Sequence, residues 1–148
     1  MKKLLLVLVA AAALTACTKE YNSYTEMNRI IIDCKAYAND WIAGPDKNSY
    51  PEFYYCDFQI PEIDNFLYNN GTVVAYYEYT DADRQVQKAL PCVIPKWDIN
   101  DPSITWTEVI DFEYERGWIR FKVTNDDFNY GEPPINPGYK LFRVVIIW

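Results

Sequence analysis

Apolar and polar residues alternate along most of the chain with a period of two, which is typical of β-strands that bury one face. Pro91 and Pro95 mark the strand that begins at Val86 as an edge strand, because proline cannot donate a ladder hydrogen bond. The last strand is apolar on both faces over its final five residues, so we expect it to lie inside a sheet. The predicted strands span residues 30–36, 53–60, 72–79 and 86–92, two strands within 104–123, and 139–148.

The same pattern predicts how the two strands within 104–123 pair. Joining them through a two-residue loop at Arg116-Gly117 places Phe112 opposite Phe121, Ile110 opposite Val123, Glu113 opposite Arg120 and Asp111 opposite Lys122. A slip by one residue would set Phe112 against Arg120. The apolar face and the charges therefore select one register.

One segment has a helical period instead. Ile63, Phe66 and Leu67 are spaced i, i+3 and i+4, and Asn70-Gly71 follows as a stop signal, which predicts a short helical turn near residues 62–69. About seven short strands with one helical turn predict an all-β fold, a two-sheet antiparallel sandwich. An immunoglobulin-like Greek key is the expected topology.

The N-terminus has the pattern of an export signal. Lys2 and Lys3 form a positive start, residues 4–13 are apolar, and Leu14-Thr15-Ala16 places small residues directly before Cys17. The apolar stretch 4–16 is shorter than the ~20 residues that span a bilayer, which argues against a single-pass anchor. We therefore expect residues 1–16 to be a signal peptide that is removed.

The cysteine directly after this segment resembles the lipobox of bacterial lipoproteins. The resemblance implies that Cys17 carries a diacylglycerol and an N-acyl chain such as palmitate, which suffices for stable membrane anchoring. Thr18 stands where an aspartate would suggest retention in the inner membrane, so the outer membrane is expected, on its periplasmic face or at the cell surface. Residues 17–26 would form the lipidated cysteine and a tether, and residues 27–148 the β-sandwich domain.

The charge of the chain argues against polyanionic partners. Losing Lys2 and Lys3 with the signal lowers the 14 basic residues to 12 against 21 acidic ones, a net charge of −9. Such a surface repels phosphate backbones, so we expect no nucleic-acid binding. Aromatic residues make up 17% of the chain, a composition that requires a packed core rather than disorder.

Few residues suggest catalysis. The chain has no histidine, which removes the commonest general base and most zinc sites, and it lacks phosphate-binding and nucleophile-elbow motifs. Asp57 and Glu108 are the acids best embedded among apolar neighbours, as a glycosidase pair would require, but an outward position in a strand explains each of them. We therefore expect that the protein has no catalytic residue, no metal site and no cofactor, and that it is not an enzyme.

Three cysteines remain once Cys17 is lipidated. Cys34 and Cys56 occupy apolar positions of predicted strands, and Cys92 follows in a third. Both buried thiols and a Cys34–Cys56 disulfide fit an exported protein with an odd number of cysteines. The two alternatives stay open.

Several aromatic residues lie in expected loops or on expected solvent-facing positions. The candidates for ligand contact are Trp41, Trp97, Trp118 and Tyr130. Loop aromatics at the end of a sandwich can stack on the rings of a neutral glycan, and they can equally cover the open ends of the sandwich.

Three stretches together resemble a group of small uncharacterised lipoproteins of Bacteroidetes-type bacteria. They are Tyr54–Ile63, with its Ile-Pro-Glu-Ile ending, Asn70–Tyr76, which starts with Asn-Gly, and the ending Phe-Arg-Val-Val-Ile-Ile-Trp at 142–148. The resemblance implies the localisation and the fold, and it identifies no catalytic residue. The expected function is a non-enzymatic, lipid-anchored interaction or structural module that contacts another protein or the envelope. A glycan-binding module is the alternative, and a small hydrolase follows both.

Overall fold

The computed structural model describes residues 28–47, 50–51, 53–98, 100–127 and 136–148. Cys17 and the predicted signal and tether lie outside the described residues. The strands are β1 (Arg29–Ala36), β2 (Ile42–Ala43), β3 (Asp46–Lys47), β4 (Tyr50–Pro51), β5 (Tyr54–Gln59), β6 (Thr72–Asp81), β7 (Arg84–Ala89), β8 (Cys92–Trp97), β9 (Thr105–Glu115), β10 (Trp118–Asp127) and β11 (Lys140–Ile147). A 3-10 turn, η1 (Ala38–Asp40), and a helix, α2 (Asn65–Asn70), complete the elements.

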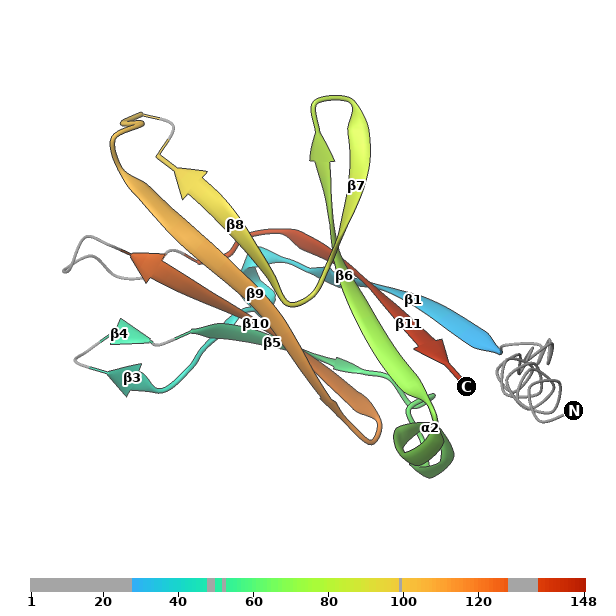
Figure 1. Cartoon of the computed structure of the whole chain (residues 1–148). Helices are drawn as coiled ribbons and strands as arrows, with labels where there is room; N and C mark the ends of the chain where they lie inside the picture. The colour runs from blue at the N-terminus through green and yellow to red at the C-terminus, as the bar shows by residue number, and fades with distance from the viewer. Residues whose placement is uncertain (1–27, 48–49, 52, 99, 128–135) are drawn as a thin grey trace, which may run out of the picture.

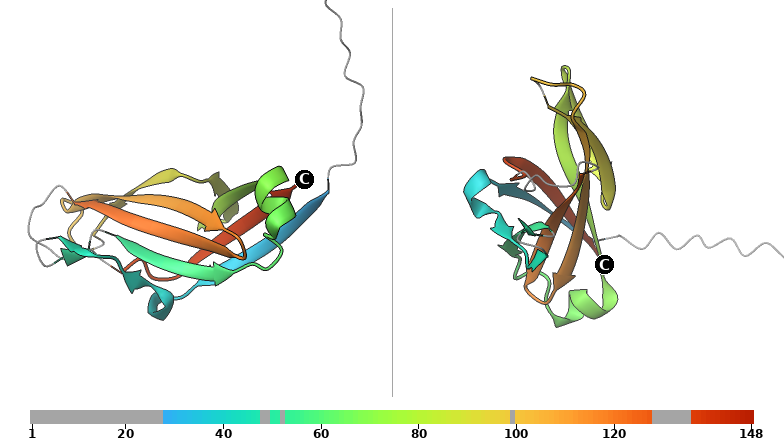
Figure 2. Two further views of the ribbon diagram at one scale, coloured as in Figure 1. Left: turned by 90° about the horizontal axis from the view of Figure 1, so that it is seen from below. Right: turned by 90° about the vertical axis from the view of Figure 1, so that its left-hand side faces the viewer.

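The strands form two antiparallel sheets, which confirms the predicted sandwich (Figures 1 and 2). The four-stranded sheet has the order β1-β11-β6-β7, and the five-stranded sheet has the order β2-β5-β10-β9-β8. A separate pair, β3-β4, lies outside both sheets. The order differs from the ABED and CFG sheets of a constant-type immunoglobulin domain, because here the first long strand pairs with the last.

Two phenylalanines join the sheets at the centre of the core. Phe121 of β10 and Phe142 of β11 are fully buried and stack with their ring centroids 3.9 Å apart and their planes 5° from parallel. Phe58 meets the Phe121 ring edge-on. The long strands β1, β5, β6, β9, β10 and β11 contribute alternate residues to this core, as their period-two patterns require.

The predicted register between β9 and β10 is confirmed at all four residue pairs, including Phe112 with Phe121 and Glu113 with Arg120. The predicted helical turn is also confirmed, although the helix is limited to six residues. It starts after Asp64, whose carboxylate accepts a hydrogen bond of 2.8 Å from the backbone N–H of Leu67. Leu67 is the residue that α2 buries in the core.

The predicted strand 86–92 is wrong in one respect, because two strands occupy this region. β7 ends at Ala89 in one sheet and β8 begins at Cys92 in the other, so the chain crosses between the sheets around Pro91. Both strands lie at sheet edges, and β8 carries Pro95, as expected of an edge strand.

Two strands also extend into predicted loops. Trp97 of β8 pairs with Thr105, and Asp127 of β10 pairs with Trp106. The eleven residues of β9 provide the partner positions for both extensions.

β11 lies between β1 and β6, which confirms its predicted place inside a sheet. Its register with β1 runs from Arg29 opposite Ile147 to Ala36 opposite Lys140. Within the described residues, the structure has no helix of the length and apolar character that crossing a membrane requires.

Candidate functional site

The candidate aromatic residues do not come together. Trp41 is 7% exposed, its indole N–H donates a 2.7 Å hydrogen bond to the carbonyl of Gly138, and its ring meets Phe142 edge-on. The expectation that Trp41 contacts a ligand is therefore wrong, because the ring is a member of the core. Tyr130 lies outside the described residues.

Trp97 and Trp118 are exposed to 64% and 43%, but they lie at opposite ends of the five-stranded sheet. Trp97 pairs with Thr105 at the start of β9, and Trp118 pairs with Glu115 at its end. Ten residues of strand separate the two positions, roughly 30 Å. One small ligand cannot contact both rings.

Trp118 lies beside a surface hollow of about 490 Å³. The hollow is on the face of the five-stranded sheet that points away from the core, near the loop that joins β9 to β10, and we call this face the outer face. It is lined by Asp57, Glu113, Tyr114, Glu115, Trp118, Ile119 and Arg120. An exposed indole, a guanidinium and three carboxylates thus surround one concave site.

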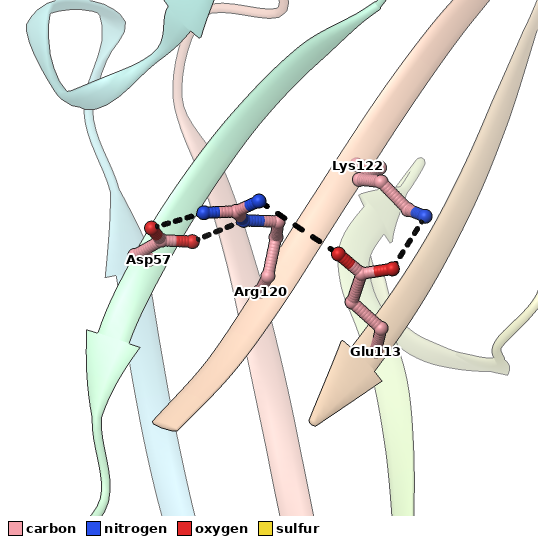
Figure 3. Close-up of polar contacts among 4 residues, drawn as sticks. All are labelled: Asp57, Glu113, Arg120 and Lys122. Carbon is pink, nitrogen blue, oxygen red and sulfur yellow. Dashed lines mark hydrogen bonds and ion pairs between the residues drawn. The ribbon is translucent and has the colours of Figure 1, made fainter. Parts of the chain in front are cut away.

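The charged side chains in this hollow are held in place by one another. Arg120 donates two hydrogen bonds to Asp57, from Nε at 2.6 Å and from Nη2 at 2.7 Å (Figure 3). Its Nη1 lies 3.8 Å from Glu113, which accepts a 2.8 Å hydrogen bond from Lys122. The four side chains form a row across β5, β10 and β9, which we call the charge row.

Arg120 is the centre of the charge row. Its guanidinium carbon lies 4.2 Å from the centroid of the Tyr55 ring, a cation–π contact that holds the group flat against the sheet. The hydrogen bonds that Arg120 donates to Asp57 raise the pKa of the guanidinium, so the group stays charged at any physiological pH. A planar, bidentate pair of this kind has less freedom than two separate surface charges.

Asp57 and Glu108, the two acids considered for catalysis, lie on opposite faces of the five-stranded sheet. Asp57 pairs with Arg120 on the outer face, whereas Glu108 is 6% exposed and lies on the inner face. Two carboxylates separated by a sheet cannot act on one bond from either side of a cleft.

Glu108 belongs to a buried ion pair. Lys140 Nζ lies 2.9 Å from Glu108 Oε2, and Lys96 Nζ lies 3.5 Å from the same oxygen. Lys140 is 3% exposed and lies over the ring of Tyr77, 5.3 Å from its centroid. Burial lowers the pKa of Lys140 and raises that of Tyr77 to about 12.

The three described cysteines carry free, buried thiols, so the candidate Cys34–Cys56 bridge is not formed in this structure. Burial raises the pKa of Cys34 and of Cys56 to about 11, and it also raises the pKa of Cys92. Thiols with such pKa values are weak nucleophiles at neutral pH. Across the described part of the chain, no three cysteine and carboxylate side chains gather as metal ligands would.

The bidentate Asp57–Arg120 pair is the part of the site that the sequence does not reveal. Periodicity places both residues on solvent-facing positions, but nothing in the sequence pairs β5 with β10. The part of the row that the sequence does predict is local: the hairpin register places Glu113 opposite Arg120, and Lys122 lies two residues further along the same face.

Comparison of the chain with models of protein families, with curated proteins and with solved structures finds no match. The function is therefore argued from the site.

Proposed function

We propose that the protein is a lipid-anchored, non-enzymatic module of the bacterial envelope that binds through the outer face of its five-stranded sheet. The anchor would be Cys17, in the outer membrane, as the lipobox-like start of the chain implies. The observation that carries the binding role is the hollow at Trp118. There a large aromatic ring is 43% exposed beside charges that are already ordered.

The arrangement of the charges supports contact rather than chemistry. A general acid needs a carboxyl group that can give a proton to the substrate, and a nucleophile needs a carboxylate oxygen that can reach it. Asp57 is held at both oxygens by Arg120, and Glu108 is held by Lys140 inside the sandwich. These pairs position side chains, which suits recognition.

Another envelope protein is the first candidate partner. Exposed tryptophan and arginine side chains are enriched among the residues that dominate protein interfaces, and Trp118 and Arg120 are neighbours on this face. The pairs that Arg120 makes with Asp57 and Glu113 order its side chain before a partner arrives, which lowers the entropic cost of binding.

A neutral glycan is the second candidate, favoured by the shape of the site. A hollow of about 490 Å³ lies within the size range of small-molecule sites. The ring of Trp118 can stack on a sugar, and the oxygens of Glu113 and Glu115 can accept hydrogen bonds from its hydroxyl groups. The acidic surface disfavours polyanionic sugars.

The anchor and the site need separate experiments. Labelling with palmitate should mark the wild-type protein and not Cys17→Ser, and equal labelling of both would refute the anchor.

A photo-crosslinking residue at position 118, in cells that express the full chain, should give one discrete protein adduct that is absent with the same residue at position 97.

Tryptophan fluorescence distinguishes the glycan. Titration with a panel of neutral oligosaccharides should give a saturable change that Trp118→Ala abolishes and Trp97→Ala preserves, if a sugar is the ligand. A protein adduct without any fluorescence change favours the first candidate. If the experiments give no adduct and no fluorescence change, binding at this face is refuted.

A further inference from the structure

The edge of β1 offers unused backbone hydrogen-bonding groups. β1 is an outer strand of the four-stranded sheet, and β11 is its partner on the other side. Asn28 and Trp148 exchange both backbone hydrogen bonds, at 3.2 and 3.1 Å. In an antiparallel ladder such pairs recur at every second residue, so the even-numbered residues of β1 bond to β11. The N–H and C=O groups of Arg29, Ile31, Asp33 and Lys35 therefore point to the open side.

The other edges of the two large sheets carry features that discourage pairing. β8 contains Pro95, β2 is only two residues long, and β7 carries a charged residue, Lys88, on its inward side opposite Tyr77. By contrast, β1 has eight residues, no proline, and an isoleucine, Ile31, that is 53% exposed. Its other outward residues, Arg29, Asp33 and Lys35, are charged, so a strand that pairs here must match these charges.

We propose that β1 pairs antiparallel with β1 of a second copy of this chain, with Ile31 at the two-fold axis. The two four-stranded sheets then continue as one sheet of eight strands. Arg29 lies opposite Asp33 of the partner subunit, and Ile30 opposite Ile32 of the partner subunit. This register forms about six backbone hydrogen bonds across the axis.

Charge and hydrogen-bond number together select this register, because an axis at Ile30 pairs only residues 29–31 of the two strands and forms about four hydrogen bonds. A shift of the axis to Ile32 sets Arg29 against Lys35, and a shift to Asp33 sets two aspartates face to face, both of which are unfavourable. An axis at Cys34 again opposes unlike charges, but it places Ile31 beyond the end of the partner strand and leaves about four hydrogen bonds. Arg29 makes no ion pair with another described residue. Asp33 already pairs with Arg143 at 2.9 Å, so Arg29 of the partner subunit would be its second cation.

Both faces of β1 supply apolar contact in this arrangement. On the outer side Ile31 lies beside Val145, and Val145 lies beside Val74, which makes an apolar row across the sheet. The two rows would join end to end at the axis. On the inner side Ile30 and Ile32 are only partly buried at the margin of the core, and the partner subunit would cover them.

Cysteine crosslinking on the full chain in its own membranes tests the register. At an antiparallel hydrogen-bonded pair the two Cα atoms are about 5.5 Å apart, within the range of a disulfide. Ile31→Cys should therefore give a disulfide-linked dimer on mild oxidation. Lys35→Cys is the matched control, because its two copies would lie eight residues, roughly 26 Å, apart. The three described thiols are buried and, under the proposed function, Cys17 is blocked by its lipid, so the wild type should stay monomeric on a non-reducing gel.

Sedimentation equilibrium of the detergent-solubilised full chain tests the charge pairs. Arg29→Glu places like charges opposite each other twice and should raise the dimer dissociation constant at least about tenfold. Arg84→Glu makes the same change on β7 and should leave the constant unchanged. Equal crosslinking at positions 31 and 35, a monomer at every concentration, or a dimer indifferent to Arg29→Glu would each overturn the proposal.

Discussion

Lys140 of β11 and Glu108 of β9 form an ion pair across the interior of the sandwich, with 2.9 Å between Nζ and Oε2. Each residue comes from a different sheet, and both are buried. A buried charge without its partner is far less stable than the pair. The two side chains therefore depend on each other, and Lys96, at 3.5 Å, gives Glu108 a weaker second contact.

Removing Lys140 should strongly destabilise the fold. We expect Lys140→Met to lower the free energy of unfolding by about 3 kcal/mol, because Glu108 is left buried with Lys96 alone. The double variant Lys140→Met/Glu108→Leu should recover most of this loss, since no uncompensated charge remains. Urea unfolding measures both variants. A loss below about 0.5 kcal/mol for the single variant would contradict the buried pair.

The buried thiols should make the fold sensitive to alkaline pH. The pKa of Cys34 and of Cys56 is raised from 9.0 to about 11, so between these values the unfolded chain loses protons that the folded chain keeps. Stability from this source is complete below pH 9 and falls as the pH rises towards 11. Between pH 8 and pH 10 we expect a loss of roughly 2–3 kcal/mol for the two thiols together.

The matched control for this pH dependence is the double variant Cys34→Ala/Cys56→Ala. Its unfolding free energy, measured by urea titration under reducing conditions, should fall less over the same pH interval, because lysine and tyrosine titrate alike in both proteins. Parallel curves for the two proteins would refute the role of the thiols.

Gly71 should not tolerate even a methyl group. A Cβ at this position would lie 2.8 Å from the carbonyl oxygen of Leu67 and 3.1 Å from that of Ile147, both of them backbone atoms that cannot move aside cheaply. We expect Gly71→Ala to cost about 1–3 kcal/mol in thermal or urea unfolding. Its φ of −95° is open to any residue, so the cost is steric.

Gly117 provides the contrasting case. It has a φ of +79° with open space around a Cβ, so Gly117→Ala should cost about 1 kcal/mol through backbone strain alone. A neutral Gly71→Ala variant would contradict the close approach of the backbone at position 71 to Leu67 and Ile147.

Trp41 should contribute to stability and not to binding. Trp41→Phe removes the hydrogen bond to the carbonyl of Gly138 and part of the ring that meets Phe142, so a loss of about 1–3 kcal/mol is expected. Trp97→Phe, at a ring that is 64% exposed, should stay within about 0.5 kcal/mol of wild type. Equal stabilities of the two variants in urea would contradict the buried position of Trp41.

The sequence predicts those parts of the fold in which neighbours along the chain also meet in space. The register of β9 on β10 follows from residues less than fifteen positions apart, whose apolar faces and charges agree. The pairing of β5 with β10 has no such local signal, so the Asp57–Arg120 pair could not be anticipated. For the same reason the expected immunoglobulin-like order differs from the observed one, in which β1 pairs with β11.

Two charged residues show where a local signal existed. Glu108 interrupts an apolar face of β9, and Lys140 shares the parity of Phe142, Val144 and Ile146 on β11. When a positive and a negative residue both fall on buried positions, they are expected to form an ion pair, since neither charge is stable alone in a core. Trp41, in contrast, follows a short turn and precedes a two-residue strand, and its sequence surroundings give no sign that Phe142 covers it.

The central position of β11 also orders events during synthesis. The ribosome makes residues 140–147 more than a hundred positions after β1, and until then β1 and β6 have nothing between them to pair with. Such long-range closure is slow, because the loop entropy is lost before the contacts form. The four-stranded sheet therefore cannot be completed until the last strand of the chain has been made.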